Sequence, residues 1–153
     1  MESIEINIYT DGSCNPQKET GAWAAILLFQ DEEITLSDCV KTKSHNAMEL
    51  LGVIKAFEYI VANNLNNNEI TVYSDSQYVV NIIDRKEKLL ESGFITKKGT
   101  ERKNSDLVKR LINYIELLHP QFIKVKAHQK KTSERNYNRD VDKLSRKLVR
   151  ENI

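Results

Sequence analysis

The longest uninterrupted apolar run in the chain covers residues 22–29 and is only eight residues long. A helix needs about 20 apolar residues to cross a bilayer, so this run predicts a buried strand and we expect no membrane partner. Before it, isoleucines occupy every second position of residues 4–8, which is typical of a half-buried strand. The N-terminal part of the chain is therefore expected to form a sheet.

The order of the remaining patterns predicts an α/β fold. Turn signals separate three strands in succession, which favours an antiparallel meander. Beyond them, apolar residues recur at helical spacing over 47–65, and strands then alternate with helices. The expected elements are strands at 4–10, 22–29, 34–40, 70–73 and 122–127, and helices at 47–65, 77–83, 104–118 and 138–150.

A strand-helix-strand crossover makes the later strands parallel to the first, so we expect a five-stranded mixed sheet with helices on both faces. The chain has 153 residues, with no internal repeat or interdomain linker, which favours a single domain over 1–153. An acidic start without an apolar segment predicts a cytoplasmic location.

Charge is divided unevenly along the chain. Residues 1–83 contain 4 Lys and Arg against 12 Asp and Glu, a net charge of −8, and residues 84–153 contain 19 against 10, a net charge of +9. Within the second part, 84–104 forms a basic helix-loop excursion with 7 basic and 4 acidic residues. This asymmetry indicates either a basic surface for a polyanion beside an acidic cation site, or basic residues that merely solvate outer helix faces.

Three ionisable residues follow predicted strands: Asp11, Asp75 and His128. Ligands of open α/β sheets gather at carboxyl strand ends. Carboxylates brought together there must share a proton or bind a cation, and oxygen ligands favour Mg²⁺ or Mn²⁺.

Each acidic residue also has a purely structural interpretation. Asp11 fits a turn before Gly12, Asp75 fits a helix cap, and Glu49 fits the third helical position of a capping box that begins at Asn46. Asp140 and Asp142 fit the first turn of a helix, where negative charge complements the dipole.

The two cysteines, Cys14 and Cys39, are not arranged as a C-x-x-C pair, and with His45, His119 and His128 they form no zinc-type spacing. We expect two free thiols. We interpret His45 and His119 as surface histidines, and we expect no small-molecule cofactor.

Six ordered segments, taken together, resemble type 1 ribonuclease H. They lie at 8–13 (IYTDGS), 46–50 (NAMEL), 74–79 (SDSQYV), 103–107 (KNSDL), 125–128 (VKAH) and 138–144, which has the pattern N-x-x-x-D-x-L. The resemblance implies a ribonuclease H-like fold and endonucleolytic hydrolysis of the RNA strand of RNA/DNA hybrids.

The same resemblance implies roles for particular residues. Two Mg²⁺ ions, for which Mn²⁺ can substitute, would be held by Asp11, Glu49, Asp75 and Asp142. His128 would assist turnover. Contacts with the hybrid are expected from Asn15, Asn46 and Gln77 in the minor groove, and from Lys97, Lys98, Arg102 and Lys103 in the basic excursion.

The sequence also departs from the family pattern. The glycine-rich loop after the first strand is replaced by residues 15–21, His45 stands where Asn is common, Ala47 where Arg is common, and Ala127 where Gly is common. The excursion carries Phe94 but none of the tryptophans of some members.

Two rival hypotheses stay open at this point: an inactive hybrid-binding module of the same fold, and a related nuclease such as a transposase, an exonuclease or a reverse-transcriptase-associated domain. The full carboxylate set argues against the first, and the short self-contained chain favours a stand-alone enzyme that acts as a monomer.

Overall fold

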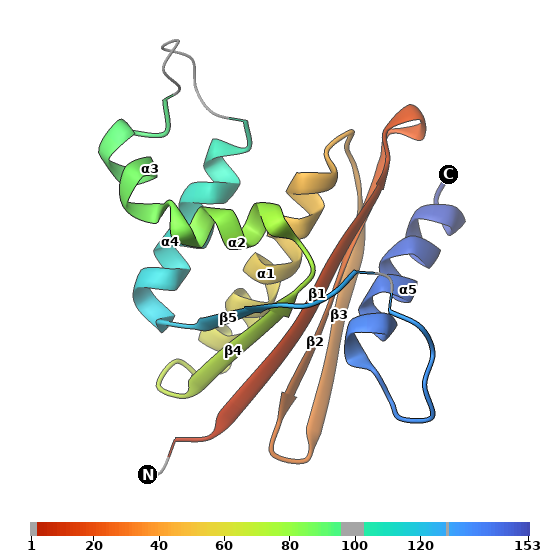
Figure 1. Ribbon diagram of the computed structural model, residues 1–153, viewed down its shortest axis with the longest axis horizontal. Helices are drawn as coiled ribbons and strands as arrows, with labels where there is room; N and C mark the ends of the chain where they lie inside the picture. Colours follow the sequence, from red (N-terminus) through yellow and green to blue (C-terminus); the bar gives the residue numbers. More distant parts are fainter. Residues whose placement is uncertain (1–2, 96–102, 128) are drawn as a thin grey trace.

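The computed structural model describes residues 3–95, 103–127 and 129–153. It contains one five-stranded sheet in the order β3-β2-β1-β4-β5 (Figure 1). β1 pairs antiparallel with β2, β2 pairs antiparallel with β3, and β4 and β5 run parallel to β1. The strands are β1 (Glu5–Asn15), β2 (Thr20–Phe29), β3 (Glu32–Lys41), β4 (Glu69–Ser74) and β5 (Gln121–Lys124).

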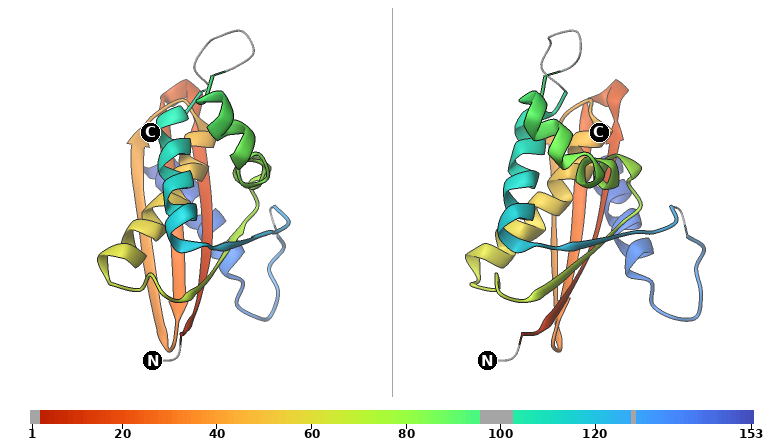
Figure 2. Two further views of the ribbon diagram at one scale, coloured as in Figure 1. Left: turned by 90° about the vertical axis from the view of Figure 1, so that its left-hand side faces the viewer. Right: turned by 60° about the vertical axis from the view of Figure 1, so that its left-hand side comes forward.

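Helices cover both faces of this sheet, so the predicted fold class is confirmed (Figure 2). The helices are α1 (His45–Ala62), α2 (Gln77–Asp84), α3 (Lys86–Ser92), α4 (Ser105–Leu118) and α5 (Tyr137–Glu151), with a 3₁₀ turn η1 (Pro16–Lys18). α1 and α4 lie on one face and α5 lies on the other. Within the described ranges no helix is both long and apolar enough to cross a membrane.

The burial of β2 explains its continuous apolar run. Ala25 and Leu27 belong to the large core beneath α1 and α4, whereas Ala24 and Ile26 pack with Val141 of α5. Both faces of β2 are covered along this run, so its apolar residues are continuous, whereas residues 5–9 of β1 alternate between buried and exposed or half-buried positions. The eight-residue run is therefore a consequence of the two-sided helix cover.

β1 is longer than the sequence pattern predicts. The Asp-Gly pair at 11–12 was interpreted as a strand end, but β1 continues to Asn15 and the chain turns only at η1. Its pairing with β4 stops at Thr10 and Ser74, while its pairing with β2 continues to Asn15. Asp11 therefore lies inside β1, at the point where the strand loses its β4 neighbour.

Gly12 serves close packing rather than a turn. An ideal Cβ at this position would lie 2.5 Å from the backbone nitrogen of Glu49 and 2.5 Å from the carbonyl carbon of Met48. Real Cβ atoms do not approach backbone atoms so closely, so the missing side chain allows α1 to lie directly against β1. The turn signal was wrong because the constraint comes from a helix distant in the sequence.

Other element boundaries also differ from the predicted ones. α1 begins at His45 instead of 47 and ends at Ala62, where Asn63 caps it. The basic excursion contains a helix as predicted, α3, which ends at Ser92 and is capped by Gly93 in the left-handed region. β5 ends at Lys124, because only Gln121 to Lys124 pair with β4.

Two glycines at the contact between α1 and β1, Gly12 on the strand and Gly52 on the helix, predict opposite effects of an added methyl group. Gly12→Ala should push α1 away from β1 and lower the unfolding free energy by about 1 to 3 kcal/mol, the usual cost of overpacking. Thermal or urea denaturation of the purified variant measures this loss.

Gly52→Ala is the matched control. A Cβ at Gly52, inside α1, would have its nearest neighbours at 3.4 to 3.5 Å, which is ordinary contact. Replacing a mid-helix glycine should therefore stabilise the protein by roughly 0.5 to 1 kcal/mol. Equal losses in both variants would contradict the packing role assigned to Gly12.

Candidate active site

Three carboxylates from different elements meet at one point. Asp11 of β1, Glu49 of α1 and Asp75, which follows β4, each offer one carboxylate oxygen, and these oxygens lie within 4.8 Å of one another. Asp11 and Glu49 are buried, with exposed fractions of 6% and 2%. Oxygen atoms alone form this donor set, which suits a hard divalent cation such as Mg²⁺.

The early end of β4 creates the space in which these groups meet. Beyond the Thr10–Ser74 pair, β1 has no neighbour on its β4 side, and the chain turns away through Asp75 into α2. Ser76 caps α2, because its hydroxyl accepts a hydrogen bond from the Val79 amide at 3.2 Å. The cap fixes the backbone next to Asp75, so the carboxylate is presented at the carboxyl end of the strand.

Asp142 reaches the same cavity from the opposite face of the sheet. The cavity has a volume of about 430 Å³, and its lining includes Asp11, Glu49, Asp75 and Asp142. Asp142 is on α5, and its side chain is 15% exposed. All four carboxylates suggested by the sequence therefore border one space.

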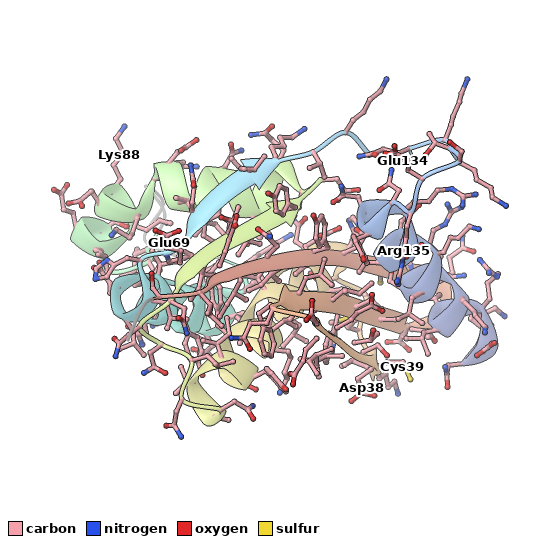
Figure 3. All side chains as sticks on the ribbon, turned by 90° about the horizontal axis from the view of Figure 1, so that it is seen from below. Asp38, Cys39, Glu69, Lys88, Glu134 and Arg135 are labelled. Atoms are coloured by element: carbon pink, nitrogen blue, oxygen red, sulfur yellow. The ribbon has the colours of Figure 1, made fainter. Side chains whose placement is uncertain are left out.

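Asp140, two residues earlier on α5, points elsewhere. Its Oδ2 accepts a hydrogen bond from Nε of Arg135 at 3.1 Å, and Arg135 also binds Glu33 of β3 through two hydrogen bonds of 2.7 and 3.0 Å. Figure 3 shows Arg135 beside α5. The buried residues of α5 are Val141, Ser145 and Val149. At 100° per residue, Asp142 is about 60° from the buried Ser145, whereas Asp140 is about 140° from it. Asp142 therefore lies close to the buried face of α5, and Asp140 lies away from it.

Burial and mutual repulsion hold protons on the cluster. The pKa of Asp11 is raised to about 10, first by desolvation and then by the negative charges of Glu49, Asp75 and Asp142. Burial also raises the pKa of Glu49. Its Oε2 is buried without a hydrogen-bond partner among the described residues. An unpartnered buried carboxylate oxygen is costly, and a bound cation would satisfy it.

His45 is a site residue that the sequence analysis missed. Its Nε2 lies 3.0 Å from the carbonyl oxygen of Gly12 and 3.2 Å from Oε1 of Glu49. The hydrogen bond with Glu49 raises the pKa of His45. Because residues four apart share one helix face, the sequence could have placed His45 beside Glu49; its side chain is nevertheless 59% exposed, as expected of a surface histidine.

The capping-box interpretation of Glu49 is wrong. The N-cap of α1 is Ser44, whose hydroxyl accepts a hydrogen bond from the Ala47 amide at 3.0 Å. Glu49 is therefore two residues further into the helix than a capping box places it, and its side chain is buried in the site instead of returning to the cap.

The residues expected to contact nucleic acid are distributed over three neighbouring cavities. Asn46 and Gln77 line the carboxylate cavity. Asn15 lines a hollow next to it and caps η1, since its Oδ1 accepts from the Lys18 amide at 3.2 Å. Lys103 lines a cavity of about 870 Å³ between α1, α2, α3 and α4. The remaining predicted residues, Lys97, Lys98, Arg102 and His128, lie outside the described residues.

Comparison with known proteins agrees with this geometry. The family model for RNase H matches residues 3–150. Ribonuclease H of Prosthecochloris aestuarii is 33% identical over 150 residues, and ribonuclease H of Acetivibrio thermocellus is also 33% identical over 150 residues; each alignment covers 97% of both chains. The crystal structure of LC9-RNase H1, a type 1 RNase H with the type 2 active-site motif, shares the fold with a TM-score of 0.81 at 16% identity, covering 100% of this chain and 75% of that one.

The chain therefore belongs to the ribonuclease H family. This result confirms the resemblance found in the sequence and places the protein among nucleases that act by hydrolysis.

The raised pKa of Asp11 predicts how stability depends on pH. A carboxyl with a pKa near 10 in the folded state and 3.8 in the unfolded chain holds its proton more tightly when folded. Its stabilising contribution is therefore complete below pH 3.8 and is lost as the pH rises toward 10. Without metal, Asp11→Asn should be more stable than the wild type at pH 8.5, by about 0.5 to 2 kcal/mol, and equally stable near pH 4.

Thermal denaturation in EDTA at both pH values measures this difference. Asp31→Asn, which removes an exposed carboxylate in the β2–β3 turn, is the control and should leave the pH trend of the wild type unchanged. The same pH trend in Asp11→Asn as in the wild type would contradict the assignment.

Proposed function

We propose that this protein cleaves the RNA strand of RNA/DNA hybrids endonucleolytically, with divalent cations held by Asp11, Glu49, Asp75 and Asp142. The observation that carries the proposal is the convergence of three carboxylate oxygens within 4.8 Å in a chain of the ribonuclease H family. One of the three residues, Glu49, also has a buried oxygen with no hydrogen-bond partner in the part of the chain that the structure describes. Two Mg²⁺ ions are the proposed occupants, and Mn²⁺ can replace them.

Two of the four carboxylates would give the site its shape, and the other two would be accessible to the substrate. Asp11 and Glu49 are buried and fixed by the contact of α1 with β1, so they give the site its shape. Asp75 and Asp142 are partly exposed at the cavity wall, where an entering phosphate would meet them. When bound, the cations would supply the Lewis acidity that activates a water and stabilises the leaving 3′ oxygen.

Recognition of the hybrid is proposed to use amide side chains at the cavity and basic residues beyond it. Asn15, Asn46 and Gln77 offer donors and acceptors to the 2′-hydroxyl, the group that distinguishes RNA from DNA. Lys97, Lys98, Arg102 and Lys103 are proposed to bind phosphates, and His128 to assist proton transfer or product release. We further propose that residues 1–153 act as one catalytic domain, in the cytoplasm and as a monomer.

Asp75→Asn should abolish cleavage while the fold is retained. The amide preserves the shape of the side chain but removes a charge that the cations need. We expect at least a ten-fold loss of rate, about 1.4 kcal/mol of barrier, on a labelled RNA/DNA hybrid with Mg²⁺. Duplex DNA, duplex RNA and single-stranded RNA are the substrate controls, and EDTA the metal control. Binding without cleavage by the wild type would identify an inactive module instead.

Asp142→Asn and Asp140→Asn form a matched pair on one helix. Asp142→Asn should sharply lower Mg²⁺-dependent cleavage, because this side chain borders the carboxylate cavity. Asp140→Asn should retain activity and cost only about 0.3 to 1 kcal/mol of stability through the helix dipole and its Arg135 partner. A Mg²⁺ titration of both variants measures the contrast, and loss of activity in the Asp140 variant alone would require another fourth ligand.

A further inference from the structure

A second hollow adjoins the carboxylate cavity at the corner between β1 and β2. Its volume is about 630 Å³, and it lies between η1 and the last two turns of α5, whose C-terminal end approaches this corner in Figure 1. Ser13, Cys14 and Arg146 line both spaces. The two hollows therefore adjoin each other along these three residues, and we call the second hollow the α5 groove.

The α5 groove has the opposite charge to the site it adjoins. Its lining contains the guanidinium groups of Arg146 and Arg150, and none of the residues described along it is acidic. Asn15, Pro16 and Gln17 form the facing wall. A basic hollow that continues from a carboxylate cluster suits an anionic chain, because one segment can sit at the cation site while the next meets the arginines.

Arg146 stands at the boundary between the two spaces. Its Nη1 lies 3.7 Å from Oδ2 of Asp142, which is an ion-pair distance and too long for a hydrogen bond. Its side chain is 55% exposed and lines the groove. A planar guanidinium matches the oxygens of a phosphate with two parallel hydrogen bonds.

We propose that Arg146 and Arg150 bind backbone phosphates of the RNA strand that flank the phosphate held at the carboxylates; this inference rests on the proposed function. Asp142, Arg146 and Arg150 follow one another at four-residue intervals, which is about 6 Å of helix rise per step. Successive phosphates of a strand are separated by about 3.4 Å along the duplex axis, so in the proposed arrangement, with the strand running along α5, each arginine would meet a phosphate within two nucleotides of the previous contact.

The same arginines also fit a purely structural role, since basic residues near a helix C-terminus complement its dipole. Lys143 and Lys147 separate the two roles. They carry the same charge on the same helix, but they are exposed outside the groove lining, and Lys147 pairs with Glu151 at 3.7 Å. Lys143→Ala/Lys147→Ala is therefore a control matched in charge and in helix.

The test is binding of an RNA/DNA hybrid in EDTA, where no cleavage occurs, over a series of salt concentrations. Arg146→Ala/Arg150→Ala should reduce the slope of log affinity against log salt by about 1.8 units, since each phosphate contact contributes about 0.9. The lysine control should change the slope by less than about half of one contact. Equal slopes in the two double variants would overturn the proposal.

Hybrids with a single uncharged methylphosphonate identify the strand. Moving this substitution along the RNA strand should weaken wild-type binding at positions within two nucleotides of the scissile phosphate and have no effect at those positions in the arginine variant. Sensitivity that is lost on the DNA strand instead would overturn the assignment to RNA.

Two measurements keep folding and function separate from this inference. Thermal denaturation checks the fold, and Arg150→Gln alone, at an exposed position in the last turn, should still lose about 0.9 units of slope. Cleavage of the hybrid by the wild type with Mg²⁺ tests the proposed function independently. An active wild type whose arginine variants keep the full slope would refute only the α5 groove.

Discussion

The contact between α1 and β1 at Gly12 is the constraint on which the site depends. With hydrogen in place of a Cβ, the backbone of Met48 and Glu49 lies directly against the strand. Glu49 is thereby placed beside Asp11, and His45, one turn earlier on α1, reaches the Gly12 carbonyl at 3.0 Å. A single absent side chain therefore turns an ordinary helix-on-sheet packing into one wall of a carboxylate cavity, and any residue with a Cβ would separate the two carboxylates.

Holding these carboxylates together is unfavourable in the absence of cations, and the surrounding core must offset the cost. The residues around the cluster on the α1 face are fully buried, including Ile8, Leu50 and Val53. Such packing resists the small movements that would let the carboxylates separate and hydrate. The raised pKa of Asp11 follows from this burial and from the neighbouring negative charges. The negative charge on Asp11 that the proposed function requires therefore lowers the stability of the fold in the absence of cations.

Much of this arrangement could be predicted from the sequence, because it rests on local patterns. The alternation in β1, the continuous run in β2 and the helical spacing of α1 each reflect which faces are buried. The parts that failed depend on contacts between distant segments: Gly12 has the composition of a turn, and its packing role exists only once α1 lies on β1. The prediction of the α1 cap failed because several polar residues near the start of α1 could serve as the cap. The contact of the exposed His45 with Gly12 and Glu49 likewise exists only once α1 lies on β1.

The register of the sheet decides which carboxylates can meet. Successive residues of a strand face opposite sides, so Gly12 faces α1 while Asp11 shares the face of Tyr9 and α5. Glu49 and Asp142 come from opposite faces, and they border one cavity only because β4 stops at the Thr10–Ser74 pair. A slip of one residue in β1 would turn Asp11 toward α1 and place a side chain where none fits. The packing of the core therefore enforces the same register that the cation site requires, which is why the fold and the site cannot vary independently.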